Sequence, residues 1–433
     1  MLGQQKKTLW TKDFTIITLG SVVSMLGNNL SGFALSLLVY DLKKSTLYYA
    51  LYIFFYTLPK LIMPILSGTF LDRFSRKKTI YTLDFISSGL YLLFAVLIYT
   101  EYFNFPILIM GSFIIGSIDS IYNVAYTSFY PLLISKGNYS KAYSVASTLE
   151  TLAAFMIPVA VAVYKTVGIV PLLVFNSVTF FIAAIMETKI GADEKYINEW
   201  NDEKADNMES VKDVSYKEVG KPSNAGRKHF WHDTKEGLSY LISEKGLLAI
   251  AIYFTFSSFA GGASQVITLP YFKSTYPDGE YKYLIVWGMA MVGRLIGGNV
   301  HYFTKLPEKK KYSIALTVYV ITSLMEGSYL YFGIDGMQIM CFVIGILGVT
   351  SYNIRVSATQ NYVPDIKKGR FNGIFSMLNT SGMLLGELLA GALTTVLPVR
   401  MVLSIFMGIC ALSAVVVIGG NKKHVSAIYN IQA

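Results

Sequence analysis

The sequence has little charge and almost no cysteine. Asp, Glu, Lys and Arg make up 15% of its 433 residues, whereas about 25% is usual in soluble globular proteins. The two cysteines, Cys341 and Cys410, both fall within apolar runs, so we predict free thiols and neither a disulfide framework nor a metal site. The sequence has no phosphate-binding glycine loop, metal-ligand spacing or nucleophile–base pattern, which argues against an enzyme, a resident cofactor and an ATP-driven pump.

Apolar runs take the place of the missing charge. Hydrophobic residues make up 53% of the chain, and they gather in twelve runs of about 20 residues or more, the length that a helix needs to cross a bilayer. The first run is too long for the core of a signal peptide and lacks a small-residue cleavage site, so we expect it to stay in the membrane. The predicted spans are 14–40, 46–71, 79–100, 105–129, 143–166, 169–188, 247–271, 282–304, 312–333, 336–360, 371–397 and 399–419. The sequence therefore predicts an all-α membrane protein with twelve transmembrane helices.

Basic residues set the predicted orientation. The net charge is +10, but Lys and Arg lie at the ends of the runs and not on one polar domain, so we predict no nucleic-acid partner. With a cytoplasmic N-terminus, eighteen Lys and Arg lie in inner segments other than the central loop, and six lie in outer segments. This asymmetry obeys the positive-inside rule. It predicts a cell-membrane protein with both termini and the central loop in the cytoplasm.

The chain divides into two halves of six spans each. Tyr122 and Asn123 in the fourth span match Tyr352 and Asn353 in the tenth, 230 residues later. Two six-span halves related by an internal repeat are the design of many secondary transporters, which bind substrate near the membrane midplane. We therefore predict two pseudo-symmetric six-helix bundles, joined by a cytoplasmic linker and followed by a cytoplasmic tail. Their bounds are 1–190 and 247–421 for the bundles, 191–246 for the linker and 422–433 for the tail.

The second part of the linker contains apolar side chains at helical spacing. Phe230, Leu238, Leu241 and Ile242 fall near one face of a helix. This predicts an amphipathic helix that lies on the inner membrane surface. The alternative is that this segment continues the seventh span.

The turn after the second span concentrates charge between two apolar runs. Charge and polar backbone do not remain in hydrocarbon, so this short segment must be a tight turn at one membrane face. Its residues include Gly68, Asp72, Arg73, Arg76 and Lys77. Their spacing resembles the G-x-x-x-D-R-x-G-R-[KR] motif of the major facilitator superfamily, with Ser75 in place of the usual glycine.

The resemblance covers nearly the whole chain and implies a secondary transporter that works by alternating access. In the family, the Asp of this motif lies beside the start of the eleventh span, which implies that Asp72 lies near Arg370 and favours the outward-open state. The basic residues of the turn would offset the partial negative charge of the last carbonyls of the second span. The alternative is that they serve only to orient the turn. The residues from Glu236 to Leu247 also resemble the macrolide-efflux and siderophore-exporter branch of this family.

A second family pattern is split between the fifth and eleventh spans. In drug antiporters of the family, glycines and a proline occur together in the fifth span. Here the eleventh span keeps the glycine spacing and the fifth keeps the proline: the residues are Gly373, Gly382, Gly386, Gly391 and Pro158. Small residues let helices approach closely, and proline kinks a helix. We predict that these positions serve packing or bending during transport, with ordinary tight packing as the alternative.

Two acids in the first half are candidates for proton coupling. Asp119 lies in the middle of the fourth span, and Glu150 lies about two turns into the fifth. Ionisable groups inside a membrane are costly and mark ion or substrate pathways. The alternative for each acid is hydrogen bonding to a nearby Ser, Thr or Tyr. Ile115 replaces the Arg that the family carries in the fourth span, so proton coupling through that Arg does not transfer to this chain.

Further candidates for a proton or substrate site lie in both halves. They are Arg355, Glu387, Asn28, Asn123 and Asn353. Arg355 is near the inner end of its span, where snorkelling explains it equally well. For the amides, hydrogen bonding between helices is the more common role. Arg294 and Glu326 also lie within spans, and the sequence assigns them no role.

Together these features predict a proton-driven exporter of an amphiphilic, macrolide-like compound. Its expected partners are that compound, protons and the lipid bilayer, and we expect a monomer. Siderophore export and nutrient uptake on the same fold remain alternatives. The alternative from a different class is a membrane sensor or scaffold that transports nothing.

Overall fold

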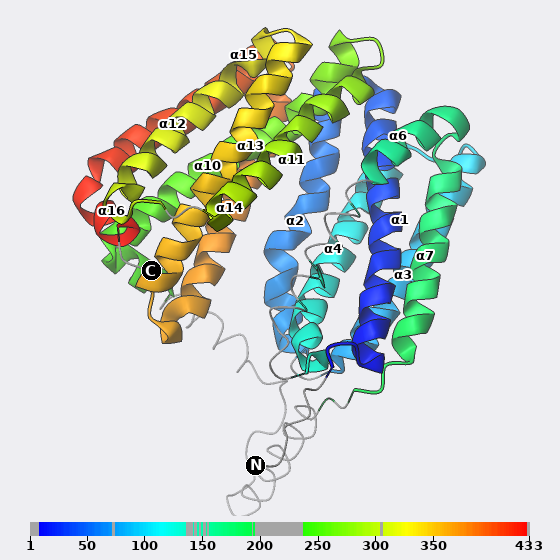
Figure 1. Cartoon of the computed structure of the whole chain (residues 1–433). Coiled ribbons are helices and arrows are strands. Elements are labelled where there is room, and N and C mark those ends of the chain that lie inside the picture. The colour runs from blue at the N-terminus through cyan, green and yellow to red at the C-terminus, as the bar shows by residue number, and fades with distance from the viewer. Residues whose placement is uncertain are drawn as a thin grey trace, which may run out of the picture. The chain divides into compact units, whose positions relative to one another are not determined.

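The protein is helical throughout the part that the computed structural model describes (Figure 1). The described residues are 8–71, 74–135, 156–192, 194, 237–303 and 306–430, with the single positions 142, 145, 146, 149 and 153. No β-strand occurs in these ranges. The predicted all-α class is therefore confirmed.

The chain forms two compact units. The first joins residues 1–41 to 55–227, and the second joins 42–54 to 228–433. The first unit contains α1 (Lys12–Lys43), most of α2 (Thr46–Leu71), α3 (Arg76–Tyr99), α4 (Phe105–Phe129), η1 (Tyr130–Leu133), α6 (Met156–Val167) and α7 (Val170–Thr188). The second contains α10 (Lys245–Thr275), α11 (Gly279–Phe303), η3 (Glu308–Lys310), α12 (Lys311–Ser328), η4 (Tyr329–Tyr331), α13 (Ile334–Tyr362), α14 (Asp365–Leu393), α15 (Val399–Ser413), η5 (Ala414–Gly419) and α16 (Lys422–Tyr429).

Short-range signals in the sequence set several helix ends. The side chain of Asn104 accepts a hydrogen bond from the backbone N–H of Ile107 at 3.1 Å, which caps α4, and a proline occupies its first turn. Between α6 and α7, Gly168 adopts a positive φ of 83°, a conformation that glycine takes without steric cost. These residues place tight turns where the apolar runs end.

Both units repeat the same helix contacts. In the first unit α3 packs against α7, and in the second α12 packs against α15. A methyl group on Gly116 of α4 would overlap the carbonyl oxygen of Tyr56 on α2. Likewise, a methyl group on Gly345 of α13 would overlap the carbonyl oxygen of Ala290 on α11. The second and fourth spans thus approach backbone to backbone in one unit, as the eighth and tenth do in the other, which supports the internal repeat.

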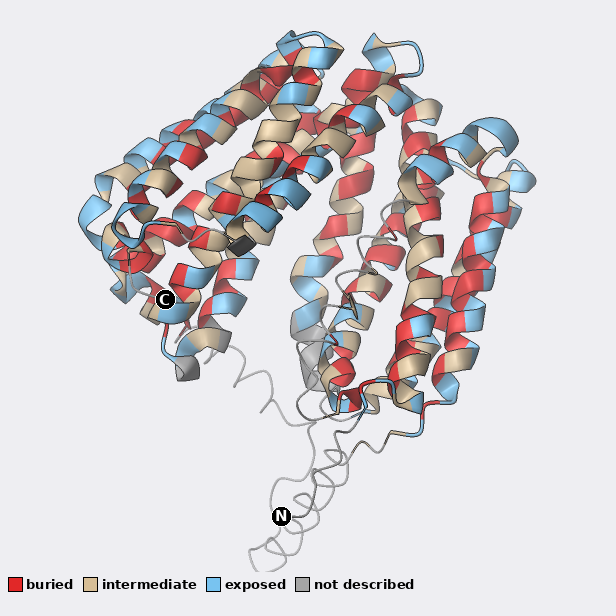
Figure 2. Ribbon diagram, in the orientation of Figure 1, coloured by how far each residue is buried: buried red, intermediate tan, exposed pale blue. Residues whose placement is uncertain are grey.

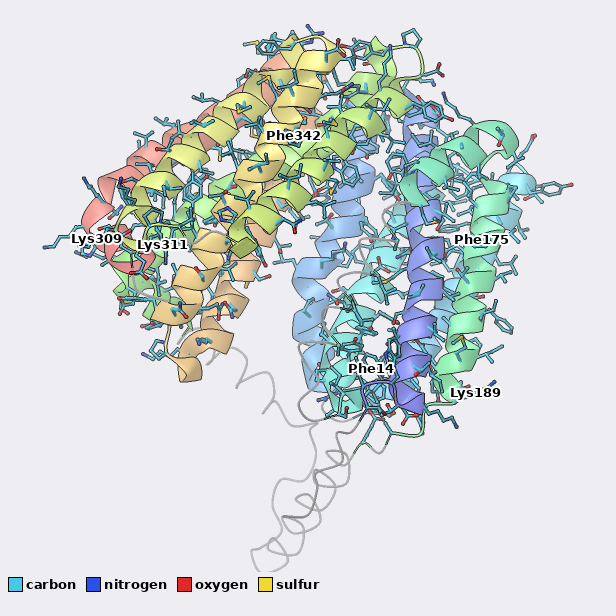
Figure 3. The ribbon with its side chains drawn as sticks, in the orientation of Figure 1. Phe14, Phe175, Lys189, Lys309, Lys311 and Phe342 are labelled. Carbon is cyan, nitrogen blue, oxygen red and sulfur yellow. The ribbon has the colours of Figure 1, made fainter. Side chains whose placement is uncertain are left out.

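The helices bury polar side chains and expose apolar ones. On α7, Asn176, Ser177 and Glu187 are buried, whereas Phe175 and Phe181 are exposed (Figures 2 and 3). Exposed apolar surface of this extent marks contact with a membrane. Within the described residues, nine helices are long and apolar enough to span a bilayer. The pattern is that of a multi-pass membrane protein.

Residues 237–243, before α10, form a separate short helical segment. Glu244 ends it with φ −99° and ψ 87°, so the segment does not continue α10. Leu241 is buried, whereas Leu238 and Ile242 are exposed. Leu238 and Ile242 are one helical turn apart and both exposed, as side chains that face a membrane surface would be, so an amphipathic helix on the inner surface stays a prediction. Phe230 lies outside the described residues.

The segment predicted as a tail contains a docked helix. Val425, Ile428 and Tyr429 of α16 are fully buried in the second unit. The Tyr429 hydroxyl lies 2.8 Å from the hydroxyl of Tyr319 on α12. At the start of α10, a methyl group on Gly246 would lie only 2.6 Å from the Ile428 side chain. Helix α16 is thus part of the core of this unit.

Candidate functional site

The charged turn is only partly described. Gly68 lies in α2, and Asp72 and Arg73 lie outside the described residues, so the expected contact of Asp72 stays a prediction. Arg76 and Lys77 form the first turn of α3. Their interactions are given by the structure.

Arg76 and Lys77 bind the C-terminal ends of two neighbouring helices. Arg76 Nη1 donates to the carbonyl oxygen of Ser128, in the last turn of α4, at 3.2 Å. Lys77 Nζ donates to the carbonyl oxygen of Ile190, just after α7, at 2.9 Å. Cations at these positions offset the partial negative charge of a helix C-terminus. These carbonyls belong to α4 and to the segment after α7, and the expected effect of the basic residues on the end of the second span stays a prediction.

An acid that the sequence interpretation overlooked holds the start of α3. Glu194 Oε1 accepts hydrogen bonds from the backbone N–H groups of Arg76 at 2.8 Å and Lys77 at 3.4 Å. The Ser75 hydroxyl donates to the other carboxylate oxygen. A carboxylate at a helix N-terminus is favoured by the free N–H groups and by the helix dipole. The serine that departs from the family motif is thus one of the groups that hold Glu194.

We expect Glu194→Ala to lower the free energy of unfolding of the first unit. The change removes the acceptor of two backbone N–H groups and one hydroxyl, and loss of such a cap costs about 1–2 kcal/mol. Thermal unfolding of the detergent-purified protein measures the loss as a lower midpoint. Lys78→Ala, an exposed side chain in the same turn, is the control. Equal midpoints for Glu194→Ala and wild type would show that the cap contributes nothing.

Asp119 lies in a polar group formed by α2 and α4. The Tyr56 hydroxyl donates to Asp119 Oδ2 at 2.5 Å. The Lys60 ammonium lies 4.1 Å from the centre of the Tyr56 ring and attracts the Asp119 carboxylate. Asp119 is partly buried. Glu150, the other predicted acid, lies outside the described residues.

Asp84 of α3 and Glu187 of α7 form a second, fully buried acidic group. Asp84 is 1% exposed and Glu187 is 0% exposed. Their carboxyl groups lie within hydrogen-bonding reach of each other. The hydroxyl of Tyr122 on α4 donates to Glu187 Oε1 at 3.5 Å. Helix α1 packs against Glu187 at Gly20, where a methyl group would lie 3.4 Å from Glu187 Oε1.

A buried apolar layer closes one side of this acidic pair. Ile17, Ile80, Ala125 and Ile190 each lie three or four residues along the chain from Gly20, Asp84, Tyr122 and Glu187, respectively, and all four belong to one buried cluster. The cluster also contains Phe14 (Figure 3) and Phe129, Tyr130, Leu133 and Ile134. It lies between the acids and the end of the unit at which α3 begins. Among the described residues, this apolar layer separates the pair from that end.

The sequence interpretation missed both members of this pair. The signal that identified Asp119, an acid within an apolar run, was present at Asp84 as well. Glu187 ends its predicted span, where an acid usually reaches water. Only the packing of α3 against α7 shows that its side chain turns inward.

The two predicted amides of the first unit lie in different environments. Asn28 Oδ1 accepts a hydrogen bond from the Tyr91 hydroxyl at 3.1 Å, which links α1 to α3. Asn123 is exposed on α4. Asn28 thus has the helix-linking contact that the alternative expected.

Arg355 lies among aromatic rings in the second unit. Its guanidinium carbon is 5.0 Å from the ring centre of Phe254, 5.4 Å from that of Tyr352 and 4.9 Å from that of Phe375. Cation–π contacts of this length stabilise a cation away from water. Asn353, two residues before Arg355, is partly buried.

The other charged candidates of the second unit lie in surroundings different from those of Arg355. Glu387 is fully buried in α14. Arg294 of α11 is exposed and attracts Glu326 of α12. The sequence assigned neither residue a role, and the structure shows that they interact with each other.

The glycines of α14 differ in their surroundings. A methyl group on Gly382 would overlap the carbonyl oxygen of Thr255, and one on Gly386 would overlap that of Phe259, so α14 lies backbone to backbone against α10. Gly391 approaches the Ala50 side chain, whereas Gly373 has nothing within 4 Å. Pro158 is an exposed residue near the start of α6. Close helix approach thus concerns Gly382, Gly386 and Gly391 but not Gly373.

The buried ionisable groups, the repeated helix packing and the exposed apolar faces agree with comparisons to known proteins. The family model of the Major Facilitator Superfamily matches residues 17–386. The chain belongs to the Major Facilitator Superfamily. One relative in this family is the uncharacterized MFS-type transporter YkuC of Bacillus subtilis (strain 168), 23% identical over 299 residues. That match covers 67% of this chain and 64% of YkuC, less than two thirds of the relative's length.

A solved structure shows the same fold. A crystal structure of a variant of the nucleoside transporter NupG aligns with a TM-score of 0.62 and 14% identity, over 94% of this chain and 99% of that chain. Together with the family match, this confirms the predicted fold class, the all-α major facilitator fold with two six-helix bundles.

Proposed function

We propose that this superfamily member is a secondary active transporter that exports amphiphilic compounds, driven by protons, through alternating access. The observation that carries the proposal is the set of carboxyl groups inside the spans of the first unit, Asp119 among them. Such groups are costly in a membrane and occur where ions or substrates pass. A carboxyl group binds and releases a proton, as proton-driven transport requires.

The substrate class and orientation are proposed from the sequence. The resemblance of residues 236–247 to the macrolide-efflux branch supports an amphiphilic compound. The distribution of Lys and Arg supports cytoplasmic termini in the cell membrane, and therefore export of a compound taken from the cytoplasm or the inner leaflet. The contact of Asp72 with the eleventh span is proposed as a latch for the outward-open state.

Uptake of a nutrient is a second candidate function. It is favoured by the fold shared with the nucleoside transporter NupG, although 14% identity carries the fold alone. The direction of substrate movement separates the two candidates. Cells that overproduce an exporter accumulate less of the compound than control cells, whereas cells that overproduce an importer accumulate more.

We expect Asp119→Asn to lower proton-driven export about tenfold or more. The amide keeps the size of the side chain and its bond to Tyr56 but cannot exchange a proton. A growth panel of amphiphilic compounds on overproducing cells first identifies a substrate, and its efflux is then followed with and without a proton ionophore. Wild-type efflux that ignores the ionophore would contradict the proposed energy source. Unchanged efflux in Asp119→Asn would leave Asp119 with a structural role.

A further inference from the structure

Asp84 and Glu187 form a buried acidic pair, whereas most acidic side chains lie at a protein surface. The two side chains come from α3 and α7, and neither reaches solvent. Within the described residues, no Lys or Arg forms an ion pair with either acid. Burying an unpaired carboxylate costs several kcal/mol even after relaxation. Two such charges in contact would also repel each other strongly in a medium of low dielectric constant.

The contact between the two acids requires a bound proton. An ionised carboxyl group only accepts hydrogen bonds, so two of them have no donor to share. One proton supplies that donor and halves the buried charge. A second proton makes the pair neutral. The geometry itself thus points to a proton as the ligand.

One oxygen of each carboxyl group is available to bind a proton. Asp84 Oδ2 and Glu187 Oε2 are both buried and have no hydrogen-bond partner within the part of the chain that the structure describes. The ionisable groups that face the pair are Tyr122 and Asp119, both from α4, and α1 contributes Gly20 and the Ser21 hydroxyl. On α4, Asp119 lies one turn before Tyr122, whereas the residues of the apolar layer follow Tyr122. The partly buried Asp119 therefore lies on the side of the pair away from that layer.

The pair is confined to one half of the internal repeat. The positions 230 residues after Asp84 and Glu187 are Ile314 and Val417. Ile314 lies in α12 and Val417 in η5, directly after α15, and α12 packs against both α15 and η5 without acids at these positions. The equivalent contact in the second half thus forms without these carboxyl groups, and the acidic pair distinguishes the first half from the second.

We propose that Asp84 and Glu187 together form the proton-carrying site of this transporter, which gains one proton and loses one in each transport cycle. This inference rests on the proposed proton-driven function and names the site that couples it. On uptake, an O–H bond forms on one carboxyl oxygen and hydronium becomes water. On release, that bond breaks and water accepts the proton. Tyr122 is a positioning residue that keeps its own proton.

The protonation state of the pair biases the packing of α3 against α7. A neutral pair is compatible with the buried contact seen here. A charged pair is stabilised by hydration, so it favours an arrangement that admits water between the two helices. A ligand shifts a conformational equilibrium by binding one state more tightly than the other, and the proton does so here.

Infrared spectroscopy of the purified protein tests the site without any substrate. We expect the wild type at neutral pH to show the carbonyl band of a protonated, buried carboxyl group, shifted in heavy water. Glu187→Gln and Asp84→Asn should each weaken this band, whereas Glu101→Gln, at an exposed turn, should not. A wild-type spectrum without the band would overturn the proposal, and so would variants with wild-type spectra. The wild-type measurement stands even if a variant fails to fold.

Transport by the same variants separates coupling from folding. In liposomes loaded with a substrate from the growth panel, we expect Glu187→Gln to keep at least half of the wild-type substrate exchange at equal pH. Accumulation driven by a pH gradient should fall at least tenfold. Equal losses of exchange and accumulation would overturn the proposal and make the pair structural. Failure of the wild type to respond to the pH gradient would instead reject the proposed function, while the infrared result would still decide whether the pair binds a proton.

Discussion

Gly386→Ala is expected to prevent most of the chain from reaching its folded state. The new methyl group would overlap the carbonyl oxygen of Phe259 on the facing helix. The methyl group is attached directly to the backbone of α14, and the oxygen belongs to the backbone of α10. Neither can therefore move aside without displacing one helix from the other. Overpacking of a core usually costs about 1–3 kcal/mol, and this site belongs at or above the upper end of that range. Size-exclusion profiles in detergent, with thermal unfolding of the monodisperse fraction, measure the loss.

Gly373→Ala is the matched control on the same helix. Gly373 is exposed and has nothing within 4 Å. The control should fold like the wild type, and a small gain in stability is expected because alanine favours helix by about 1 kcal/mol over glycine. Similar yields of folded protein from both variants would show that the α10–α14 contact tolerates separation.

Removal of residues 422–433 is expected to destabilise the second unit by roughly 5 kcal/mol. The truncation takes away three fully buried side chains, Val425, Ile428 and Tyr429, and each is worth about 1.5–3 kcal/mol. It also removes the hydrogen bond from the backbone N–H of Tyr312 to Asn430 Oδ1, at 3.0 Å. Thermal unfolding and the yield of monodisperse protein measure the effect.

Lys423→Ala is the control for the truncation. Lys423 lies on the exposed face of α16, so its removal should leave the unfolding midpoint unchanged. A truncated protein with the wild-type midpoint would mean that α16 contributes nothing to the unit despite its burial.

The spans and the family motif were predictable because they depend on local composition. A run of about 20 apolar residues has one stable solution in a bilayer, a helix that satisfies its own backbone. Gly68, Arg76 and Lys77 were recognisable by spacing alone. The family match and the NupG fold confirm what these local signals implied.

The partners of the charged residues were not predictable in the same way. Arg76 and Lys77 reach carbonyls of α4 and of the segment after α7, and Glu194 reaches back to α3. Their sequence separations range from 52 to 118 residues. Burial is equally non-local, since Glu187 ends an apolar run and yet turns into the unit. Sequence indicates that a charge is unusual, whereas packing decides what the charge contacts.

The most direct test of the account is an imposed pH gradient across liposomes that contain the purified wild-type protein. With a substrate from the growth panel inside or outside, the account predicts substrate movement against its own gradient while the pH gradient lasts. A proton ionophore should abolish this movement within the same experiment. Movement of the substrate against its own gradient that needs no pH gradient, or that follows an imposed sodium gradient instead, would contradict proton-driven transport.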